Sequence, residues 1–359
     1  MKTPTRRRIL VVCTRRIGDV LLTTPLIRSL RKAWQDAQID VLVLQGTEGV
    51  LVGNPDIDRV RALPKGGTRW ARLRFYLSLL QSYDISLAAT GSDRARFLAR
   101  WAGRRCLGLW SLTDPARGRR WLPGHWVDFS ETGEHAIESP LRLAKAIGVP
   151  PWREVVPPQR KAFPAITGLR QSYAVVHPWP KFSYKAWPRE RWVSLGRALA
   201  LDGLQVVLSG GPDVEEMAFC AGLAEEIPGA LNLCGTQGFD SLAKLISLAR
   251  VYIGPDTVMT HIAAATGAPT VALFGPSNPV RWGPWPARWR QPESPWPFRG
   301  SRNFGNVWLI QGEAPCVPCL MEGCERKLDS RSRCLDELPL GRVTAAIAQA
   351  LALASVRGN

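Results

Sequence analysis

The residues best suited to chemistry are an acid, a hydroxyl and a histidine that follow an apolar run and a Gly-Pro turn. Asp256 comes first, Thr257 is next to it, and His261 stands four residues after Thr257. We expect a helix over 257–266 with Asp256 at its N-cap, where the carboxylate accepts hydrogen bonds from backbone N–H groups. The N–H groups of Thr257 and Val258 then form an anion site, because a helix N-terminus carries partial positive charge. This pattern indicates a site for a phosphorylated ligand beside sugar hydroxyls, and an ordinary capped helix with a packed histidine is the alternative.

A second acid, Asp19, opens the first helix that the sequence predicts. The run T-R-R-I-G before it stands where a nicotinamide-binding protein would carry G-x-G-x-x-G. The absence of that motif disfavours a dehydrogenase, and Gly18 would allow a tight strand-to-helix turn. A catalytic carboxylate and a plain helix-start carboxylate both fit this position, since the helix dipole stabilises either one.

Cationic and glycine-rich candidates follow two other apolar runs. Lys185 stands just before a Trp-Pro pair that opens a helix, so we expect it on the rim of a ligand cleft, assisted by Lys181. A solvated loop lysine is the alternative, because lysine is exposed in most proteins. Gly210 and Gly211 permit close backbone approach to a ligand. Asp213 could accept from a ribose hydroxyl or cap the next helix.

Strands and helices alternate along the chain in two series, which predicts two α/β domains with largely parallel sheets. Apolar strands are expected at 9–13, 39–44, 60–63 and 85–89, and again at 173–177, 205–209, 251–253 and 270–274. A Pro-rich, partly basic segment at 149–161 separates the two series. We therefore place a first domain at 1–160, a second at 161–340, and a terminal helix and tail at 341–359. Ligands of such sheets bind at the strand C-termini.

Length and charge narrow the function classes. At 359 residues the chain exceeds a comfortable single core. Its net charge of +17 favours polyanionic surroundings, meaning nucleic acid, anionic lipid headgroups or phosphorylated glycans. The basic start resembles a signal peptide, but Arg15 and Arg16 end its apolar run too early. No run reaches the ~18–20 apolar residues of a spanning helix, so we expect a cytoplasmic protein with peripheral membrane contact.

Three blocks, in this order along the chain, resemble the signatures of glycosyltransferase family 9, the bacterial heptosyltransferases of lipopolysaccharide core assembly. The first is R-x-G-D-x-L with an early proline, at residues 16–25. The second is H-P followed by K-x-W-P-x-E-R-W, at 177–192, and the third extends the Asp256 segment over 252–284. The resemblance implies a GT-B architecture, in which two Rossmann-like domains face each other across a cleft and the C-terminal helix packs back toward the first domain.

The same resemblance implies roles for the candidates. Asp19 would be the general base that takes the proton from the acceptor hydroxyl, with Arg16 and Gly18 in the acceptor site. Lys185 would neutralise the donor diphosphate as a point charge. The remaining donor-binding positions would be Asp256, Thr257, Val258, His261, Gly210, Gly211, Lys181 and Asp213.

The implied reaction is an inverting, metal-independent transfer of a heptose-type sugar that needs no cofactor. ADP-heptose is the expected donor, and a lipopolysaccharide-core or related glycan is the expected acceptor. The implied location is the anionic surface of the inner membrane, on its cytoplasmic face, with no specific nucleic acid as partner. Val258 stands where the family often has glycine and narrows the pocket near the diphosphate, which leaves a related sugar nucleotide open.

Two other functions were weighed against this reaction. A sugar-nucleotide epimerase shares the architecture but needs no acceptor, and the R-x-G-D block argues against it. A non-enzymatic nucleic-acid-binding protein is supported only by the net charge and by residues 281–302, where tryptophans and arginines alternate with prolines. Those tryptophans could stack on bases or sugar rings, anchor the chain at a lipid interface, or simply pack the loop. The resemblance favours contact with a lipid-linked glycan or an anionic bilayer.

Two metal-type patterns are present. Cys316, Cys319, Cys324 and Cys334 resemble a structural zinc site in spacing, with reduced packing thiols as the alternative. The D-x-D triplet of Asp56 and Asp58 is typical of metal-binding glycosyltransferases of the other major fold. It follows Asn-Pro in a turn, and neither a strand nor a partner acid supports a metal site there, so we interpret it as turn chemistry.

Overall fold

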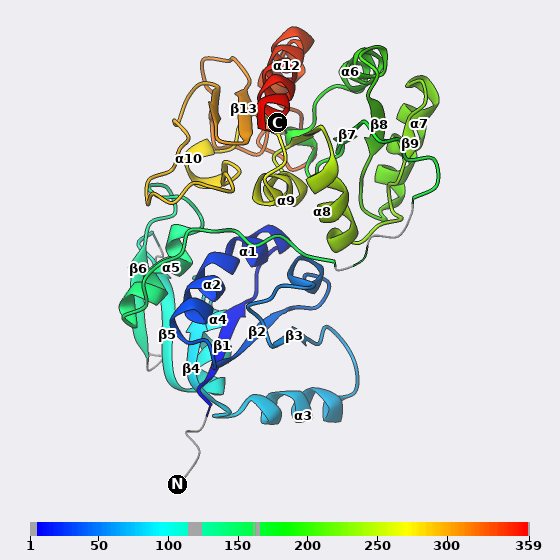
Figure 1. Cartoon of the computed structure of the whole chain (residues 1–359). Helices are drawn as coiled ribbons and strands as arrows, with labels where there is room; N and C mark the ends of the chain where they lie inside the picture. Colours follow the sequence, from blue (N-terminus) through cyan, green and yellow to red (C-terminus); the bar gives the residue numbers. More distant parts are fainter. Residues whose placement is uncertain (1–5, 114–123, 161, 163–165, 358–359) are drawn as a thin grey trace. The chain divides into compact units, whose positions relative to one another are not determined.

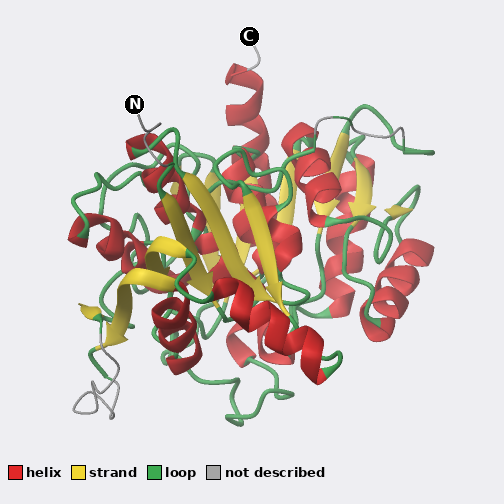
Figure 2. Cartoon of the chain, turned by 90° about the horizontal axis from the view of Figure 1, so that it is seen from below, coloured by secondary structure: helices red, strands yellow, loops and turns green. Residues whose placement is uncertain are grey.

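The computed structural model describes residues 6–113, 124–160, 162 and 166–357, and the chain divides into two compact units (Figure 1). The N-terminal unit extends to Pro158 and includes residues 290–293, and the C-terminal unit takes the rest. Each unit has its own sheet with helices packed around it, as the yellow strands and red helices of Figure 2 show.

The sheet of the N-terminal unit has six parallel strands in the order β3-β2-β1-β4-β5-β6. Their bounds are β1 (Arg8–Cys13), β2 (Gln38–Leu44), β3 (Arg59–Leu63), β4 (Tyr83–Ala88), β5 (Gly103–Ser111) and β6 (His125–Phe129). From β1 the chain builds outward through β2 and β3, then returns to β4 on the other side of β1. Such a reversal of strand order leaves a crevice at the carboxyl ends of the two central strands.

The helices of this unit are α1 (Ile17–Leu22), α2 (Thr24–Ala33), α3 (Arg69–Leu79), α4 (Asp93–Ala102) and α5 (Glu138–Ala146), with a 3₁₀ turn η1 (Glu48–Leu51). The first helix that the sequence predicts, opened by Asp19, is in fact two helices, α1 and α2. Pro25 causes the break, because it has no N–H to donate to the carbonyl of Leu21. The Thr24 hydroxyl donates to that carbonyl instead, at 2.7 Å.

The sheet of the C-terminal unit has seven strands in the order β12-β13-β11-β10-β7-β8-β9, and only β12 is antiparallel to its neighbour. The bounds are β7 (Tyr173–Val176), β8 (Gln205–Leu208), β9 (Leu231–Asn232), β10 (Val251–Pro255), β11 (Thr270–Phe274), β12 (Arg302–Phe304) and β13 (Val307–Gln311). Strand order reverses between β7 and β10, so the second crevice lies at their carboxyl ends.

The helices of the C-terminal unit are η3 (Ser183–Lys185), α6 (Arg189–Leu201), α7 (Val214–Glu226), α8 (Phe239–Leu248), α9 (Val258–Thr266), α10 (Pro279–Trp282), α11 (Arg333–Asp336) and α12 (Leu340–Arg357). The predicted terminal helix is α12, and its buried residues Val343, Ile347 and Ala350 pack into the core of the C-terminal unit. Among the described residues, no helix combines the length and apolarity needed to cross a bilayer.

Candidate active site

The crevice between β7 and β10 gathers most of the predicted donor-side residues. His177 follows β7 directly, and its backbone N–H donates to the carbonyl of Ile253 in β10, at 2.9 Å. Asp256 follows β10 directly. The two strands run parallel side by side, so the residues after them emerge at the same edge of the sheet.

Lys185, which is half-buried, and Asp256, which is buried, form an ion pair at this edge, with 2.5 Å between Nζ and Oδ2. Burial alone would raise the pKa of the Asp256 carboxyl. The charge and hydrogen bond of Lys185, together with a hydrogen bond from Ser277, instead hold that pKa below its usual value. The pair therefore keeps a carboxylate and an ammonium in the crevice, both available to a polar ligand.

The predicted N-cap is wrong. Helix α9 begins at Val258 and its N-cap is Thr257, whose side chain makes no capping hydrogen bond. Asp256 does not cap the helix because its carboxylate is engaged by Lys185, which is 71 residues away in the sequence. The first N–H groups of α9 consequently lack a side-chain acceptor, which preserves the anion site expected there.

His261 lies on the first turns of α9 and is buried. Burial lowers the pKa of its imidazole to about 4, against the opposing effect of the Asp256 charge, so the ring is neutral near pH 7. Its Nδ1 is buried without a hydrogen-bond partner among the described residues. The hydroxyl of Thr257 lies against the phenol of Tyr252. Buried polar atoms are nearly always paired, so the imidazole nitrogen indicates that a polar ligand completes the site.

The turn that carries Lys185 is held by a distant segment of the same unit. The indole N–H of Trp187 donates to the carbonyl of Leu338 at 3.0 Å. The hydroxyl of Ser332 donates to the carbonyl of Tyr184 at 2.6 Å. Lys181 is on the same turn but exposed, over the ring of Phe182. The structure therefore fixes Lys185 in the crevice and leaves Lys181 at the surface.

Gly210 and Gly211 follow β8, and both are approached by the protein's own side chains. An ideal Cβ on Gly210 would lie 2.6 Å from Oε1 of Glu216. Glu216 accepts a hydrogen bond from the N–H of Gly211, while burial raises the pKa of its carboxyl. Asp213 caps α7, accepting from the N–H groups of Glu215 and Glu216 at 3.0 and 3.4 Å. Asp213 thus makes the capping contacts, and its acceptance of a ribose hydroxyl stays a prediction. Glu216, beside Gly211, is a carboxylate that our sequence reasoning missed.

Asp19 lies in the first turn of α1, at the crevice of the N-terminal unit. The ends of β1 and β4 meet there through the hydroxyls of Thr14 and Ser92, 3.2 Å apart. Asp19 is half-buried above Cys13. Burial, and then the negative charge of Asp19, raise the pKa of the Cys13 thiol to about 12. The thiol of Cys13 is therefore protonated near pH 7.

Arg16 and Gly18 frame Asp19. Arg16 is the exposed N-cap residue of α1, without a side-chain capping bond. Gly18 does not form the predicted tight turn, because it lies inside α1 and has no positive φ. An ideal Cβ on Gly18 would meet nothing within 4 Å. Glycine here leaves open space beside Asp19 rather than relieving backbone strain.

The cysteine block does not form the predicted zinc site. Cys316 and Cys324 are exposed, Cys319 is half-buried and Cys334 is buried. Burial, and then the neighbouring thiols, raise the pKa of Cys334 to about 12. Within the part of the chain that the structure describes, no three His, Cys, Asp or Glu side chains are arranged to hold a metal ion. A protonated, packed Cys334 fits the alternative of packing thiols.

Asp56 and Asp58 are engaged by arginines. Asp56 pairs with Arg28 at 2.5 Å, and its backbone N–H donates to the side chain of Asn54. Asp58 pairs with Arg31 at 2.6 Å. These contacts support the interpretation of the triplet as turn chemistry.

The tryptophans of 281–302 are mostly packed inside the C-terminal unit. Trp285 and Trp296 are buried, and their indole N–H groups donate to the carbonyls of Trp289 and Pro284 at 3.2 and 3.1 Å. The expected contact with a glycan, a base or a bilayer is therefore wrong for these two residues, and loop packing explains them.

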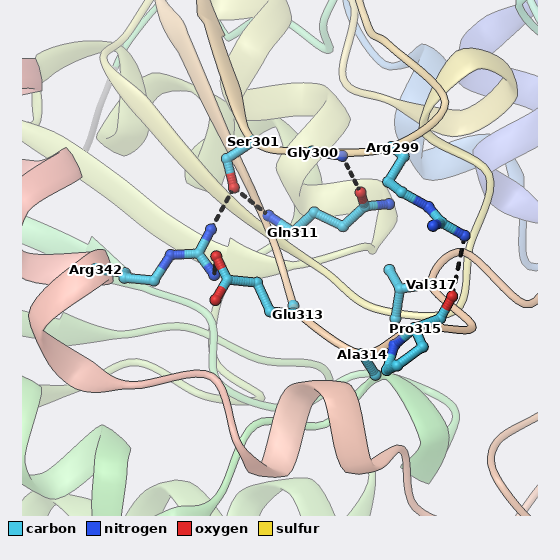
Figure 3. A pocket seen from close by; sticks show the side chains of 10 residues that line it. Arg299, Gly300, Ser301, Gln311, Glu313, Ala314, Pro315, Val317 and Arg342 are labelled. Carbon is cyan, nitrogen blue, oxygen red and sulfur yellow. Dashed lines mark hydrogen bonds and ion pairs between the residues drawn. The ribbon is translucent and has the colours of Figure 1, made fainter.

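A hollow of about 370 Å³ lies at the end of β13 (Figure 3). Arg342 and Arg299 reach it from opposite sides, donating to the hydroxyl of Ser301 and the carbonyl of Pro315. Gln311 accepts from the N–H of Gly300 at 2.6 Å. None of the predicted donor-binding residues lines this hollow.

The buried histidines predict how stability depends on pH. Burial lowers the pKa of both His177 and His261 from 6.5 to about 4. Below pH 6.5 the unfolded chain binds protons that the folded chain does not, so stability is complete above pH 6.5 and lost as pH falls toward 4. The expected loss is on the order of 1 kcal/mol per pH unit for each ring. Asp256 adds a loss in the same direction only below about pH 3.8.

Urea unfolding at a series of pH values measures this loss. His261→Gln should remove the contribution of that ring to the pH dependence, whereas His125→Gln, at an exposed position, should leave the pH dependence unchanged. Equal free energies of unfolding at pH 7 and pH 5 in the unsubstituted protein would contradict the assignment of both rings as buried and neutral.

The sequence is similar to known heptosyltransferases. A family model described as glycosyltransferase family 9 (heptosyltransferase) matches residues 72–295. The chain is 28% identical over 320 residues to lipopolysaccharide heptosyltransferase 3 of Escherichia coli, covering 81% of this chain and 92% of the relative. It is also 28% identical over 355 residues to lipopolysaccharide heptosyltransferase 1 of Pseudomonas aeruginosa, covering 92% and 91%.

Solved structures share the fold. A glycosyltransferase family 9 structure from Veillonella parvula superposes with a TM-score of 0.74 at 18% identity, covering 96% of this chain and 97% of that one. The E. coli heptosyltransferase WaaC with ADP superposes with a TM-score of 0.72 at 21% identity, covering 96% and 99%. The predicted α/β class of GT-B type, with two Rossmann-like domains, is confirmed.

Proposed function

Because the chain belongs to glycosyltransferase family 9 and is a glycosyltransferase, we propose that it transfers heptose from ADP-heptose to a lipopolysaccharide-core acceptor. The curated relatives are named as lipopolysaccharide heptosyltransferases, and two solved structures of E. coli heptosyltransferase WaaC hold ADP and ADP-2-deoxy-2-fluoro heptose. The proposal includes an inverting, metal-independent reaction at the cytoplasmic face of the inner membrane. Membership of an enzyme family sets aside the non-enzymatic nucleic-acid-binding alternative.

The observation that carries the donor proposal is the group of Lys185, Asp256 and His261 beside the uncapped start of α9. A diphosphate at this helix start lies against free backbone N–H groups and draws the Lys185 ammonium away from Asp256. As the bond to the sugar breaks, negative charge grows on the diphosphate. The ammonium and the helix N-terminus then stabilise that charge where it develops.

The sugar contacts the polar groups of the site that the diphosphate does not contact. The Asp256 carboxylate, freed from Lys185, accepts hydrogen bonds from sugar hydroxyls. The neutral ring of His261 offers its unpaired Nδ1 to another hydroxyl. A neutral imidazole suits this role, because it adds no charge opposing the development of positive character at the anomeric carbon.

Asp19 supplies the base in this proposal. The acceptor hydroxyl attacks the anomeric carbon from the face opposite the diphosphate, so its bond forms as the bond to the diphosphate breaks and the configuration inverts. Asp19 takes the hydroxyl proton. A carboxylate in the first turn of a helix is a weak base. That suffices here because the hydroxyl becomes acidic only as its new bond to carbon forms.

The test is a transfer assay with ADP-heptose and a core oligosaccharide that lacks the heptose. We expect ADP release matched by the addition of one heptose to the acceptor, with inversion at the anomeric carbon. Excess EDTA should leave the initial rate unchanged, since Lys185 and α9 carry the leaving-group charge. Binding of another sugar nucleotide in place of ADP-heptose would overturn the assignment of ADP-heptose as the donor. Immediate inactivation by EDTA that Mg²⁺ reverses would overturn the metal-independent mechanism.

A further inference from the structure

Helix α3 is fastened to the N-terminal unit along one face only. Leu79 on that face is buried in the core of the unit, and Phe75 and Tyr76 pack against the same core. The Arg61 guanidinium donates to the hydroxyl of Ser78 at 2.6 Å. The indole N–H of Trp101 donates to the carbonyl of Tyr76 at 2.8 Å. The helix is therefore held firmly, and its opposite face is turned to solvent.

That opposite face is apolar. Trp70, Leu73, Leu77 and Leu80 are 79%, 47%, 54% and 45% exposed. The spacing of Trp70, Leu73 and Leu77 places these three on one stripe of α3, and Leu80 is the C-cap residue that follows the helix. We call these four residues the α3 stripe. Single exposed apolar residues are ordinary, but a contiguous row of this kind marks an interaction surface.

The segment that carries the α3 stripe is basic. Arg69 and Arg74 are exposed and border the stripe on its two sides, about 40° beyond Leu73 and about 40° beyond Trp70 by the ~100° advance per residue. Residues 59–83 contain six basic side chains and no Asp or Glu, namely Arg59, Arg61, Lys65, Arg69, Arg72 and Arg74. An apolar stripe edged by arginines, with tryptophan at one end, has the composition of a helix that lies in a membrane interface.

The positive charge of this segment discriminates between two possible partners of the α3 stripe, a second copy of the chain and an anionic bilayer. A second copy docking face to face would bring six basic residues against six, with no acid in the segment to offset them. An anionic bilayer matches both features at once, because lipid phosphates pair with the arginines while the stripe enters the boundary between headgroups and acyl chains. The tryptophans first expected at a lipid surface, Trp285 and Trp296, are buried elsewhere.

We propose that α3 docks the chain on an anionic phospholipid bilayer through the α3 stripe and the arginines beside it. This inference rests on the proposed function in one respect: the purpose of docking would be to bring the enzyme to an acceptor carried by lipid. Docking leaves Asp19 uncovered. Asp19 follows the carboxyl end of β1, whereas α3 ends just before the start of β4, and β1 and β4 are parallel neighbours (Figure 1).

Co-sedimentation of the full chain with vesicles tests the proposal. We expect binding to vesicles of phosphatidylcholine mixed with phosphatidylglycerol, weak binding to phosphatidylcholine alone, and weakening by salt. The double variant Leu73→Gln/Leu77→Gln should bind the mixed vesicles about tenfold less well or worse. Arg69→Gln/Arg74→Gln should lose the preference for anionic lipid. The matched control is Leu201→Gln/Leu248→Gln, two exposed leucines of the C-terminal unit, which should bind like the unsubstituted protein.

Melting temperature and transfer to a soluble, deacylated acceptor show that each variant is folded. Both should be unchanged, since no substituted residue belongs to the catalytic machinery. Equal vesicle binding by the α3 variant and the control would overturn the proposal, as would a shift from dimer to monomer caused by the α3 substitutions alone. A chain that docks but transfers no heptose would refute the proposed function and leave the docking inference standing.

Discussion

Asp19→Asn is expected to abolish glycosyl transfer while leaving donor affinity nearly unchanged. The substitution keeps the size of the side chain but removes its ability to take a proton from the acceptor hydroxyl. Loss of a general base lowers kcat by roughly 10²–10⁴-fold. The measurement is kcat with saturating substrates, together with the Kd for ADP-heptose from calorimetry.

Glu215→Gln is the matched control for Asp19→Asn. Glu215 is also an acid in the first turn of a helix, α7, and it is exposed. Both variants lose a favourable interaction with a helix dipole, worth about 0.3–1 kcal/mol, so a shared small fall in melting temperature is expected. Only Asp19→Asn should lose activity. Donor affinity that falls in step with the rate would show that Asp19 contacts the donor or supports the fold.

Lys185→Ala is expected to weaken the binding of both ADP-heptose and free ADP. The expected loss of binding free energy is about 1.5–3 kcal/mol, which is usual for a charge-assisted contact. Turnover at saturating donor should fall as well, because the ammonium faces charge that grows as the bond breaks. Titration calorimetry with ADP gives the first value and steady-state kinetics the second. Lys181→Ala, on the same turn but exposed, is the matched control and should change both values much less.

The ion pair with Asp256 complicates the single variant. Removing Lys185 leaves a buried carboxylate without its partner, which by itself destabilises the crevice. The double variant Lys185→Ala/Asp256→Asn removes both charges and separates loss of the diphosphate contact from that penalty. If ADP binds the double variant as tightly as the unsubstituted protein, Lys185 does not contact the diphosphate.

The central strands could be predicted because both faces of a parallel sheet are buried and the strands are apolar throughout. Strands whose residues are less uniformly apolar could not. The interior strand β5 begins with Gly103 and two exposed arginines, and the edge strand β12 has only three residues, two of them polar, so neither reads as an apolar run. Pro25 signalled the break between α1 and α2, but the apolar period across it concealed the signal.

Site residues could be predicted where the pattern is local in the sequence, and they could not be predicted where it depends on the fold. The segment around Asp256 was found because strand, acid and helix are contiguous in the sequence. The role of Asp256 was misassigned because its partner, Lys185, is distant in the chain and no local pattern reveals it. Glu216 was missed since an acid in a first helical turn is common, and only the fold shows it beside Gly211. The tryptophans of 281–302 were misread because composition does not report exposure.

The bonds that hold the Lys185 turn set a lower limit on how far the protein can be shortened. Ser332 and Leu338 secure Tyr184 and Trp187, yet both lie beyond residue 295, where the match to the family ends. A fragment trimmed to that limit would keep Lys185, Asp256 and His261 but lose β13, α12 and the two bonds that seat the lysine. Expression fragments and chimeras of this enzyme should therefore retain the chain through α12, although the matched family region stops well before it.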